Sequence, residues 1–208
     1  MREIDEQALV RKAAKGNPDA FEQLLLKYQT PVYHLAMRMT GNPDDAADMT
    51  QETFLKAWKS LDTFQFNSSF SSWLFRLASN TCLDFLRSAK KRQTVNITMV
   101  DDEGEEQTME FVDTAPTPEE ATISNEDREM LKEALSQLEP EQRQILALRV
   151  VSNMSYSDIA QALGVKEGTV KSRLARAREN LQKKLLQIGN KTGFPTSKLV
   201  KGGFGNEL

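Results

Sequence analysis

The stretch from Ser155 to Lys184, SYSDIAQALGVKEGTVKSRLARARENLQKK, constrains the fold more than any other part of the chain. Ser155 and Asp158 have the spacing of a capping box at the start of a first helix. Gly164 suits the left-handed residue that ends this helix, and a second helix is expected to begin near Glu167. Two helices joined by so tight a turn predict a helix-turn-helix, whose second helix enters the major groove of DNA.

Apolar residues recur every three or four positions along the second helix, which predicts one buried stripe. The stripe consists of Val170, Leu174, Ala177, Leu181 and Leu185. Arginine suits bidentate contact with guanine and lysine suits phosphates, so the basic face beside the stripe is the predicted DNA-binding face. Its candidate residues are Lys166, Thr169, Lys171, Ser172, Arg173, Arg176 and Arg178. The alternative is an ordinary helical bundle with a basic, solvated helix.

The bulk composition leaves room for one large domain or two small ones in 208 residues. The chain has no apolar run long enough to span a membrane and no apolar signal core at its start, so we expect a cytoplasmic protein. The single Cys82 is predicted to be a buried thiol, and the lone His34 to be a surface residue. We therefore expect no metal site, no cofactor and no small-molecule substrate.

The charge is strongly segregated, although the formal net charge is only −3. Residues 94–129 carry 12 acidic side chains and 1 basic side chain, whereas the flanking segments are mildly basic. The acidic stretch also holds prolines and few large apolar residues, so it cannot bury enough surface to fold alone. We predict that it is a flexible linker between two folded parts.

Helical periodicity predicts the remaining elements. Helices are expected over Ala20–Met39, over Asn42–Ser60 and from near Ser71 to the basic cluster at 90–92, with Pro31 kinking or breaking the first. The second of these is expected to bury Ala47, Thr50, Phe54, Trp58 and Leu61. The helix that opens at Pro140 is expected to bury Ile145, Leu146, Leu148, Val150 and Val151. The predicted fold is all-α, with two small helical domains at 1–93 and 124–188, the linker at 94–123 and a flexible tail at 189–208.

Two features of the first domain point to further partners. The helix Asn42–Ser60 presents a stripe of like charges, which costs a little stability and suggests a basic partner, although a solvated helix face is an equal alternative. The stripe comprises Asp45, Asp48 and Glu52, with Gln51 beside it.

The second feature is a group of aromatic side chains around a short polar loop, a pattern suited to stacking on unpaired bases. At least half of the rings Phe64, Phe66, Phe70, Trp73 and Phe75 are expected to be core, which leaves Gln65, Asn67, Ser68 and Ser69 as the better base-contact candidates.

Four stretches of the chain, in their order and spacing, resemble a bacterial RNA polymerase sigma factor of the extracytoplasmic-function group in the sigma-70 family. They are AFEQLLLKYQTPVYHLAMRMTGN, DDAADMTQETFLKAW, FSSWLFRLASNTCLDFLR and LEPEQRQILALRVVSNMSYSDIAQALGVKEGTVKSRLARARENL. It implies that 1–93 is sigma region 2 and that 124–188 is sigma region 4. The sequence departs from the family's pattern at Phe66 and Asn67, where a basic residue and a glycine are usual, and at Lys166, which replaces a small capping residue.

The resemblance implies a role for each candidate set. The stripe of Asp45, Asp48, Gln51 and Glu52 would bind the clamp helices of the largest polymerase subunit, and region 4 would touch the polymerase flap. The loop before FSSWLFR would open the −10 element and capture a flipped base. The residues implied at the −10 element are Phe64, Gln65, Phe66, Asn67, Ser68, Ser69, Phe70, Arg76 and Asn80. Region 4 would read the −35 element in duplex DNA.

The resemblance also implies a regulatory partner, a membrane-anchored anti-sigma factor that would hold the protein at the inner membrane face. Three other functions compete with the sigma factor. A stand-alone helix-turn-helix repressor or activator would bind duplex DNA tightly without polymerase. A sigma-like adaptor would tolerate replacement of the loop aromatics. An enzyme is not expected, because the sequence has no phosphate-binding loop and no nucleophile constellation.

Overall fold

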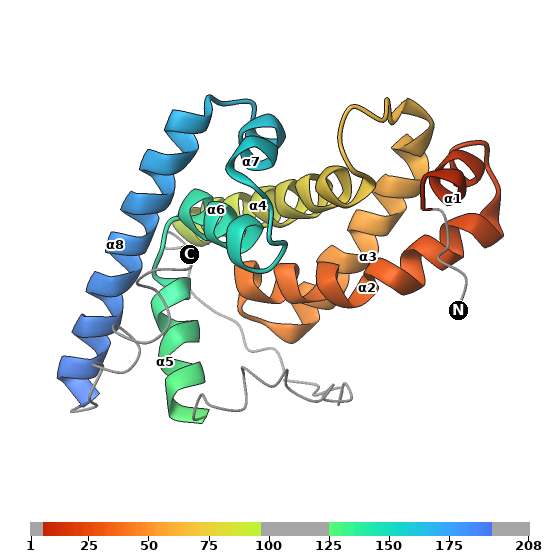
Figure 1. The fold of residues 1–208 in the computed structure, drawn as a ribbon. Helices are drawn as coiled ribbons and strands as arrows, with labels where there is room; N and C mark the ends of the chain where they lie inside the picture. Colours follow the sequence, from red (N-terminus) through yellow and green to blue (C-terminus); the bar gives the residue numbers. More distant parts are fainter. Residues whose placement is uncertain (1–5, 97–124, 193–208) are drawn as a thin grey trace.

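The computed structural model describes residues 6–96 and 125–192. Its α-helices are α1 (Glu6–Ala13), α2 (Pro18–Thr40), α3 (Pro43–Ser60), α4 (Phe70–Asn96), α5 (Asn125–Ser136), α6 (Pro140–Val150), α7 (Tyr156–Leu163) and α8 (Glu167–Thr192), and one 3-10 turn, η1, spans Leu61–Thr63. No β-strand occurs within the two described ranges, and the all-α fold class is confirmed. Figure 1 shows α1–α3 at one end of the molecule and α5 with α8 at the other, and α4 runs between them.

Local capping chemistry fixes the start and end of the helices in the first half. The Asn17 side chain accepts a hydrogen bond from the Ala20 amide at 2.8 Å, and Gly41, with φ of 75°, ends α2. The next residue, Asn42, caps α3 by accepting from the amides of Asp44 and Asp45 at 2.8 and 3.1 Å. This turn lies where the predicted helices Ala20–Met39 and Asn42–Ser60 meet.

Of the two effects expected at Pro31, a kink or a break, the break does not occur, because α2 continues through this residue. An internal proline costs a helix about 3 kcal/mol. The residues after it, Val32, Leu35 and Met39, are all fully buried against the core, and this burial outweighs the lost backbone hydrogen bond.

Helix α3 buries a different face from the predicted one. The fully buried positions are Ala46, Thr53 and Ala57, whereas Ala47 and Thr50 are only partly buried. Trp58 is 39% exposed and lies against Phe21 with ring centroids 4.9 Å apart. Small side chains let α3 approach both α2 and α4, and the large indole remains at the edge of this contact. Phe54 and Leu61 are buried as predicted.

The second half forms the predicted helix-turn-helix around α7 and α8. The capping box is complete: the Ser155 hydroxyl accepts from the Asp158 amide at 3.0 Å, and the Ser155 amide donates to the Asp158 carboxylate at 3.3 Å. Gly164 ends α7 with φ of 64°. All five residues of the predicted apolar stripe on α8 are buried. In α6, however, Val150 is 39% exposed, and Gln144, absent from the predicted core, is 4% exposed.

The two halves contact each other through polar groups on α6. Arg143 donates from Nη1 to the Met39 carbonyl at 2.8 Å, near the end of α2 where helical carbonyls lack internal donors. Gln144 donates from Nε2 to Ser79 Oγ at 3.2 Å and to Asn80 Oδ1 at 3.0 Å, both on α4. A helix of the second half thus covers part of α4.

Two exposed ion pairs extend this contact toward the end of α4. Arg87 pairs with Glu141 at 2.8 Å, and Lys90 pairs with Glu139 at 2.9 Å. The hydrogen bond from Arg87 holds the pKa of Glu141 below its usual value. The predicted linker lies mostly outside the described residues, except that α4 includes positions 94–96. Helix α8 likewise continues to Thr192, and the rest of the predicted tail lies outside the described residues.

Replacing Arg143 by alanine is expected to weaken the contact between the halves by about 1–3 kcal/mol, because a carbonyl at a helix end loses a charged donor. The matched control, Arg87→Ala, removes an exposed ion pair and is expected to cost about 0–1 kcal/mol. Small-angle X-ray scattering of both variants compares their radii of gyration in solution. Equal radii for the two variants would contradict the prediction.

Candidate nucleic-acid interface

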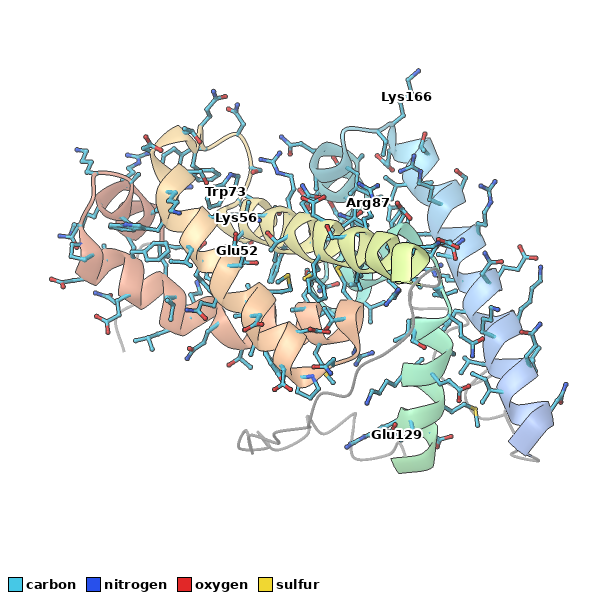
Figure 2. The ribbon with its side chains drawn as sticks, turned by 180° about the vertical axis from the view of Figure 1, so that it is seen from behind. Glu52, Lys56, Trp73, Arg87, Glu129 and Lys166 are labelled. Atoms are coloured by element: carbon cyan, nitrogen blue, oxygen red, sulfur yellow. The ribbon has the colours of Figure 1, made fainter. Side chains whose placement is uncertain are left out.

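The predicted DNA-binding residues at the start of α8 form an exposed basic face. Lys166, Arg173 and Arg176 are exposed, and Figure 2 shows Lys166 at the tip of the turn before α8, pointing away from the body. The Lys166 side chain cannot cap the helix, but its carbonyl accepts from the amides of Thr169 and Val170 at 2.9 and 3.2 Å. Guanidinium groups on the outer face of a recognition helix have the geometry for bidentate contact with guanine.

Two members of the set make contacts within the protein. Lys171 pairs with Glu167 at 3.2 Å, and its ammonium lies 5.9 Å from the centre of the Tyr156 ring. The Arg149 guanidinium lies 5.3 Å from the centre of the same ring. Two cations therefore lie close to the Tyr156 ring at the turn. Separately, the exposed Ser172 donates its hydroxyl hydrogen to the Thr169 carbonyl at 3.0 Å.

Arg178 differs from the other arginines of the predicted face. It is only partly exposed, and its Nε and Nη2 atoms are buried without a hydrogen-bond partner. Residue 178 is one turn beyond Leu174 and next to Ala177, so it lies at the margin of the buried stripe. Arg178 therefore lies beside the stripe as predicted, but it is less exposed than Arg173 and Arg176.

The aromatic loop (residues 64–70) is anchored by buried side chains and has an exposed tip. Phe64, Phe70, Trp73 and Phe75 are buried, which confirms that more than half of these rings are core. The rings of Phe64 and Trp73 lie 5.4 Å apart. Figure 2 shows Trp73 near the start of α4, where the loop joins it. Phe66 is 40% exposed, and the polar residues Gln65, Asn67 and Ser69 are also exposed.

The structure does not bring all of the predicted −10 residues together. Asn80 is ten residues beyond Phe70, which corresponds to about 15 Å along a helix. It lies at the contact with α6, where its side chain accepts from Gln144. Arg76 is partly buried between these two places. The predicted −10 surface therefore extends along α4 from the aromatic loop to the contact between the halves.

The acidic stripe lies on α3, with Asp48 and Gln51 exposed and Asp45 and Glu52 half-buried. Burial, followed by the nearby Asp48 and Asp44, raises the pKa of Asp45 above its ordinary value. Glu52 is paired with Lys56 at 3.3 Å, one turn further along the helix (Figure 2). The uncompensated negative charge is thus concentrated near the start of α3, which is the arrangement that attracts a basic partner.

Two other residues singled out in the sequence, Cys82 and His34, have the burial and exposure that were predicted for them. Cys82 is a buried free thiol whose pKa burial raises to about 12, and His34 is exposed, both as predicted. Within residues 6–96 and 125–192, no histidine, cysteine and carboxylate side chains gather as a metal site would require. No helix in the described part of the chain combines the length and apolar character needed to cross a bilayer.

Sequence reasoning missed several residues of these surfaces. Gln144 shares one helix face with Pro140 and Leu148, a four-residue spacing that could have indicated its burial. No spacing in the sequence links Tyr156 or Arg149, which flank the turn, to Lys171. No spacing links Arg11 to Phe66 either, although the Arg11 guanidinium lies 5.4 Å from the centre of the Phe66 ring.

A helix-turn-helix half and a helical half with an acidic helix and an aromatic loop together define a two-part DNA-binding transcription factor. Comparison with known proteins agrees. Residues 24–92 match the model of sigma-70 region 2, and residues 128–181 match that of sigma-70 region 4. The chain is 32% identical over 179 residues to the ECF RNA polymerase sigma factor SigW of Bacillus subtilis, covering 86% of this chain and 96% of SigW. It is 31% identical over 183 residues to the ECF sigma-E factor of Haemophilus influenzae, covering 88% and 96% respectively.

Solved structures point the same way. The fold resembles the sigma factor RpoE of Bartonella quintana, solved in complex with the anti-sigma factor NepR, with a TM-score of 0.58 and 30% identity over 81% of this chain and 97% of that one. It also resembles CnrH, solved with the cytosolic domain of CnrY, with a TM-score of 0.59 and 25% identity over 88% and 97% respectively. The chain belongs to the sigma-70 family of RNA polymerase sigma factors, in the extracytoplasmic-function group. Such a factor binds core RNA polymerase and directs it to promoters.

Replacing Asp45 by asparagine is expected to stabilise the protein by about 0.2–0.5 kcal/mol at pH 7, because it removes like-charge repulsion within α3. The raised pKa of Asp45 means that its ionisation opposes folding, so the gain should vanish as the pH falls through that pKa and the wild-type carboxyl becomes neutral. Urea unfolding at a series of pH values measures this difference. A gain that persists at low pH would contradict the electrostatic origin.

Proposed function

We propose that the protein is an alternative sigma factor in which each half has one recognition task. The exposed basic start of α8 reads the −35 element, and the aromatic loop with Asn80 captures and opens the −10 element. The acidic stripe of α3 binds the clamp helices of the polymerase. The observation that carries the proposal is the exposed Arg173 and Arg176 on a helix whose turn and buried stripe are those of a helix-turn-helix.

We further propose that the contact between the halves opens when the promoter is engaged. Asn80 is a candidate −10 residue, and its side-chain oxygen accepts from Gln144 of α6. Promoter DNA and α6 therefore compete for the same group. A partner that holds α4 and α6 together would keep the factor inactive, and both similar solved structures are complexes, one of them with an anti-sigma factor by name. An anti-sigma factor, membrane-anchored or not, is the proposed regulator.

The proposed setting is the cytoplasm, or its membrane face while such a regulator is bound. The proposal gives the protein no catalytic step of its own, because initiation chemistry belongs to the core polymerase. Transcription with purified components tests the function directly. The protein is added to bacterial core RNA polymerase and a pool of promoter fragments, and the transcripts are sequenced. Start sites that share two spaced elements support the proposal, whereas tight duplex binding by the protein alone without initiation favours a repressor.

The clamp assignment predicts that Asp48→Arg abolishes binding to core polymerase, because it reverses the charge of an exposed group at the centre of the acidic stripe. Asp84→Arg, which reverses an exposed carboxylate on α4, is the matched control and should bind normally. Fluorescence anisotropy of labelled factor titrated with core enzyme measures both. Normal affinity of the Asp48 variant would exclude this assignment.

The −35 assignment predicts that Arg173→Ala and Arg176→Ala each weaken recognition by about 1–3 kcal/mol and relax specificity at one base pair. Lys183→Ala removes an exposed charge further along α8 and serves as the control. Holoenzyme affinity for duplexes with single substitutions in the −35 element gives the loss at each position. An equal loss of affinity for every −35 sequence would show that these arginines contact phosphates and not bases.

A further inference from the structure

Phe66 has a backbone conformation that a bulky residue rarely adopts. Its φ is 57°, in the left-handed region, which is strained for a residue of this kind. Burial offsets this strain only in part, since the side chain remains 40% exposed. Strained residues of this kind concentrate at sites where a ligand is bound. The tip of the aromatic loop is such a place.

Two groups define the position of the Phe66 ring. On the loop, the buried Phe64 lies with its ring centroid 4.8 Å from that of Phe66, at an angle of 51°. From α1, the Arg11 guanidinium lies over the Phe66 ring at 5.4 Å from its centre. A cation over an aromatic face is attracted to it by the charge distribution of the ring. The exposed ring is thus paired with a positive charge from another element.

Helix α1 is itself firmly placed. Glu6 accepts a hydrogen bond from the Tyr28 hydroxyl at 2.8 Å and pairs with Lys27, and Val10 and Ala13 are buried. These contacts fix α1 on α2, and Figure 1 shows it at the same end of the molecule as the loop before α4. Helix α1 also precedes residue 24, where the match to sigma-70 region 2 begins.

We propose that Arg11 and Phe66 form a clamp that holds one unpaired base of the −10 strand between the guanidinium and the phenyl ring. The inference rests on the proposed function of the aromatic loop and adds a residue of α1 to it. Unpaired bases stack both on aromatic rings and on guanidinium planes. The two halves of the clamp therefore suit the two faces of one base.

The distance between the two groups fits this role. A base stacked on both sides needs about 3.5–4.0 Å to each neighbour, or roughly 7–8 Å between them. The present 5.4 Å is the closed clamp, and opening it needs a displacement of only about 1.6–2.6 Å. The exposed, flexible Arg11 side chain supplies this without any change in the backbone. Before DNA binds, the guanidinium covers the ring, and afterwards it stacks on the base and keeps its charge beside the phosphates.

The test combines variants of Arg11 with promoter fragments that lack single bases. Holoenzyme containing wild type, Arg11→Ala, Arg11→Lys or the control Lys12→Ala is assembled on the promoter found by transcript sequencing. Lys12 is the next residue and is also exposed, so its replacement removes the same charge from the same helix. Each non-template position of the −10 element is made abasic in turn, and the amount of open complex is measured by permanganate footprinting.

We expect Arg11→Ala to reduce open complex about 3- to 30-fold on the intact promoter, and Lys12→Ala less than about twofold. Removing the captured base should abolish the difference between Arg11→Ala and wild type at that one position. Arg11→Lys should resemble Arg11→Ala, because lysine keeps the cation over Phe66 but offers no planar face to a base.

Two results would overturn the clamp. An Arg11→Ala defect of equal size at every abasic position would show that Arg11 only supports the loop, and the absence of any defect would show that it is dispensable. A wild-type holoenzyme that is insensitive to every abasic site would instead refute base capture by the loop, and with it the proposed function of this surface. The two failures are therefore distinguishable.

Discussion

The packing of α4 is the interaction on which both halves of the molecule depend. One face of this helix completes the core of the first half through Trp73, Leu74 and Ala78, all buried against α2 and α3. The same helix carries Ser79 and Asn80, to which Gln144 of α6 donates. The aromatic loop joins its first turn. A single helix thus supports the aromatic loop and contacts the helix-turn-helix half.

The contact between the halves includes one buried glutamine, one charged hydrogen bond to a carbonyl and two exposed ion pairs, beside the buried apolar residues of α6. Exposed ion pairs contribute about 0–1 kcal/mol each, and buried polar groups are satisfied as well by water as by each other when they separate. These polar groups fix how α6 lies on α4, and they are the bonds that the proposed opening on a promoter would break.

The parts of the fold that were predictable from the sequence are those governed by short-range chemistry. The capping box at Ser155 and the left-handed Gly164 each depend on residues within two turns of each other, and the apolar stripe of α8 repeats every three or four residues. The buried face of α3 was not predictable in the same way. Its register depends on small residues that fit between two neighbouring helices, and the periodicity of Phe54 and Trp58 alone gives a face rotated away from that contact. The spacing of Gln144 from Pro140 and Leu148 could have indicated its burial, but its hydrogen-bond partner lies on a helix more than sixty residues away.

The two candidate DNA sites are built according to the state of the DNA that each must recognise. Duplex DNA presents a preformed groove, so the candidate −35 residues lie on one regular helix whose exposed arginines need only fit. An unpaired base must first be extruded, at a cost of a few kcal/mol, and its position is not preformed. The candidate −10 site accordingly has buried aromatic side chains that anchor the loop and an exposed tip whose side chains can adjust. Its partners come from α1, the loop and α4, which no local pattern links, and this is why the sequence indicated the loop but not the arginine that faces it.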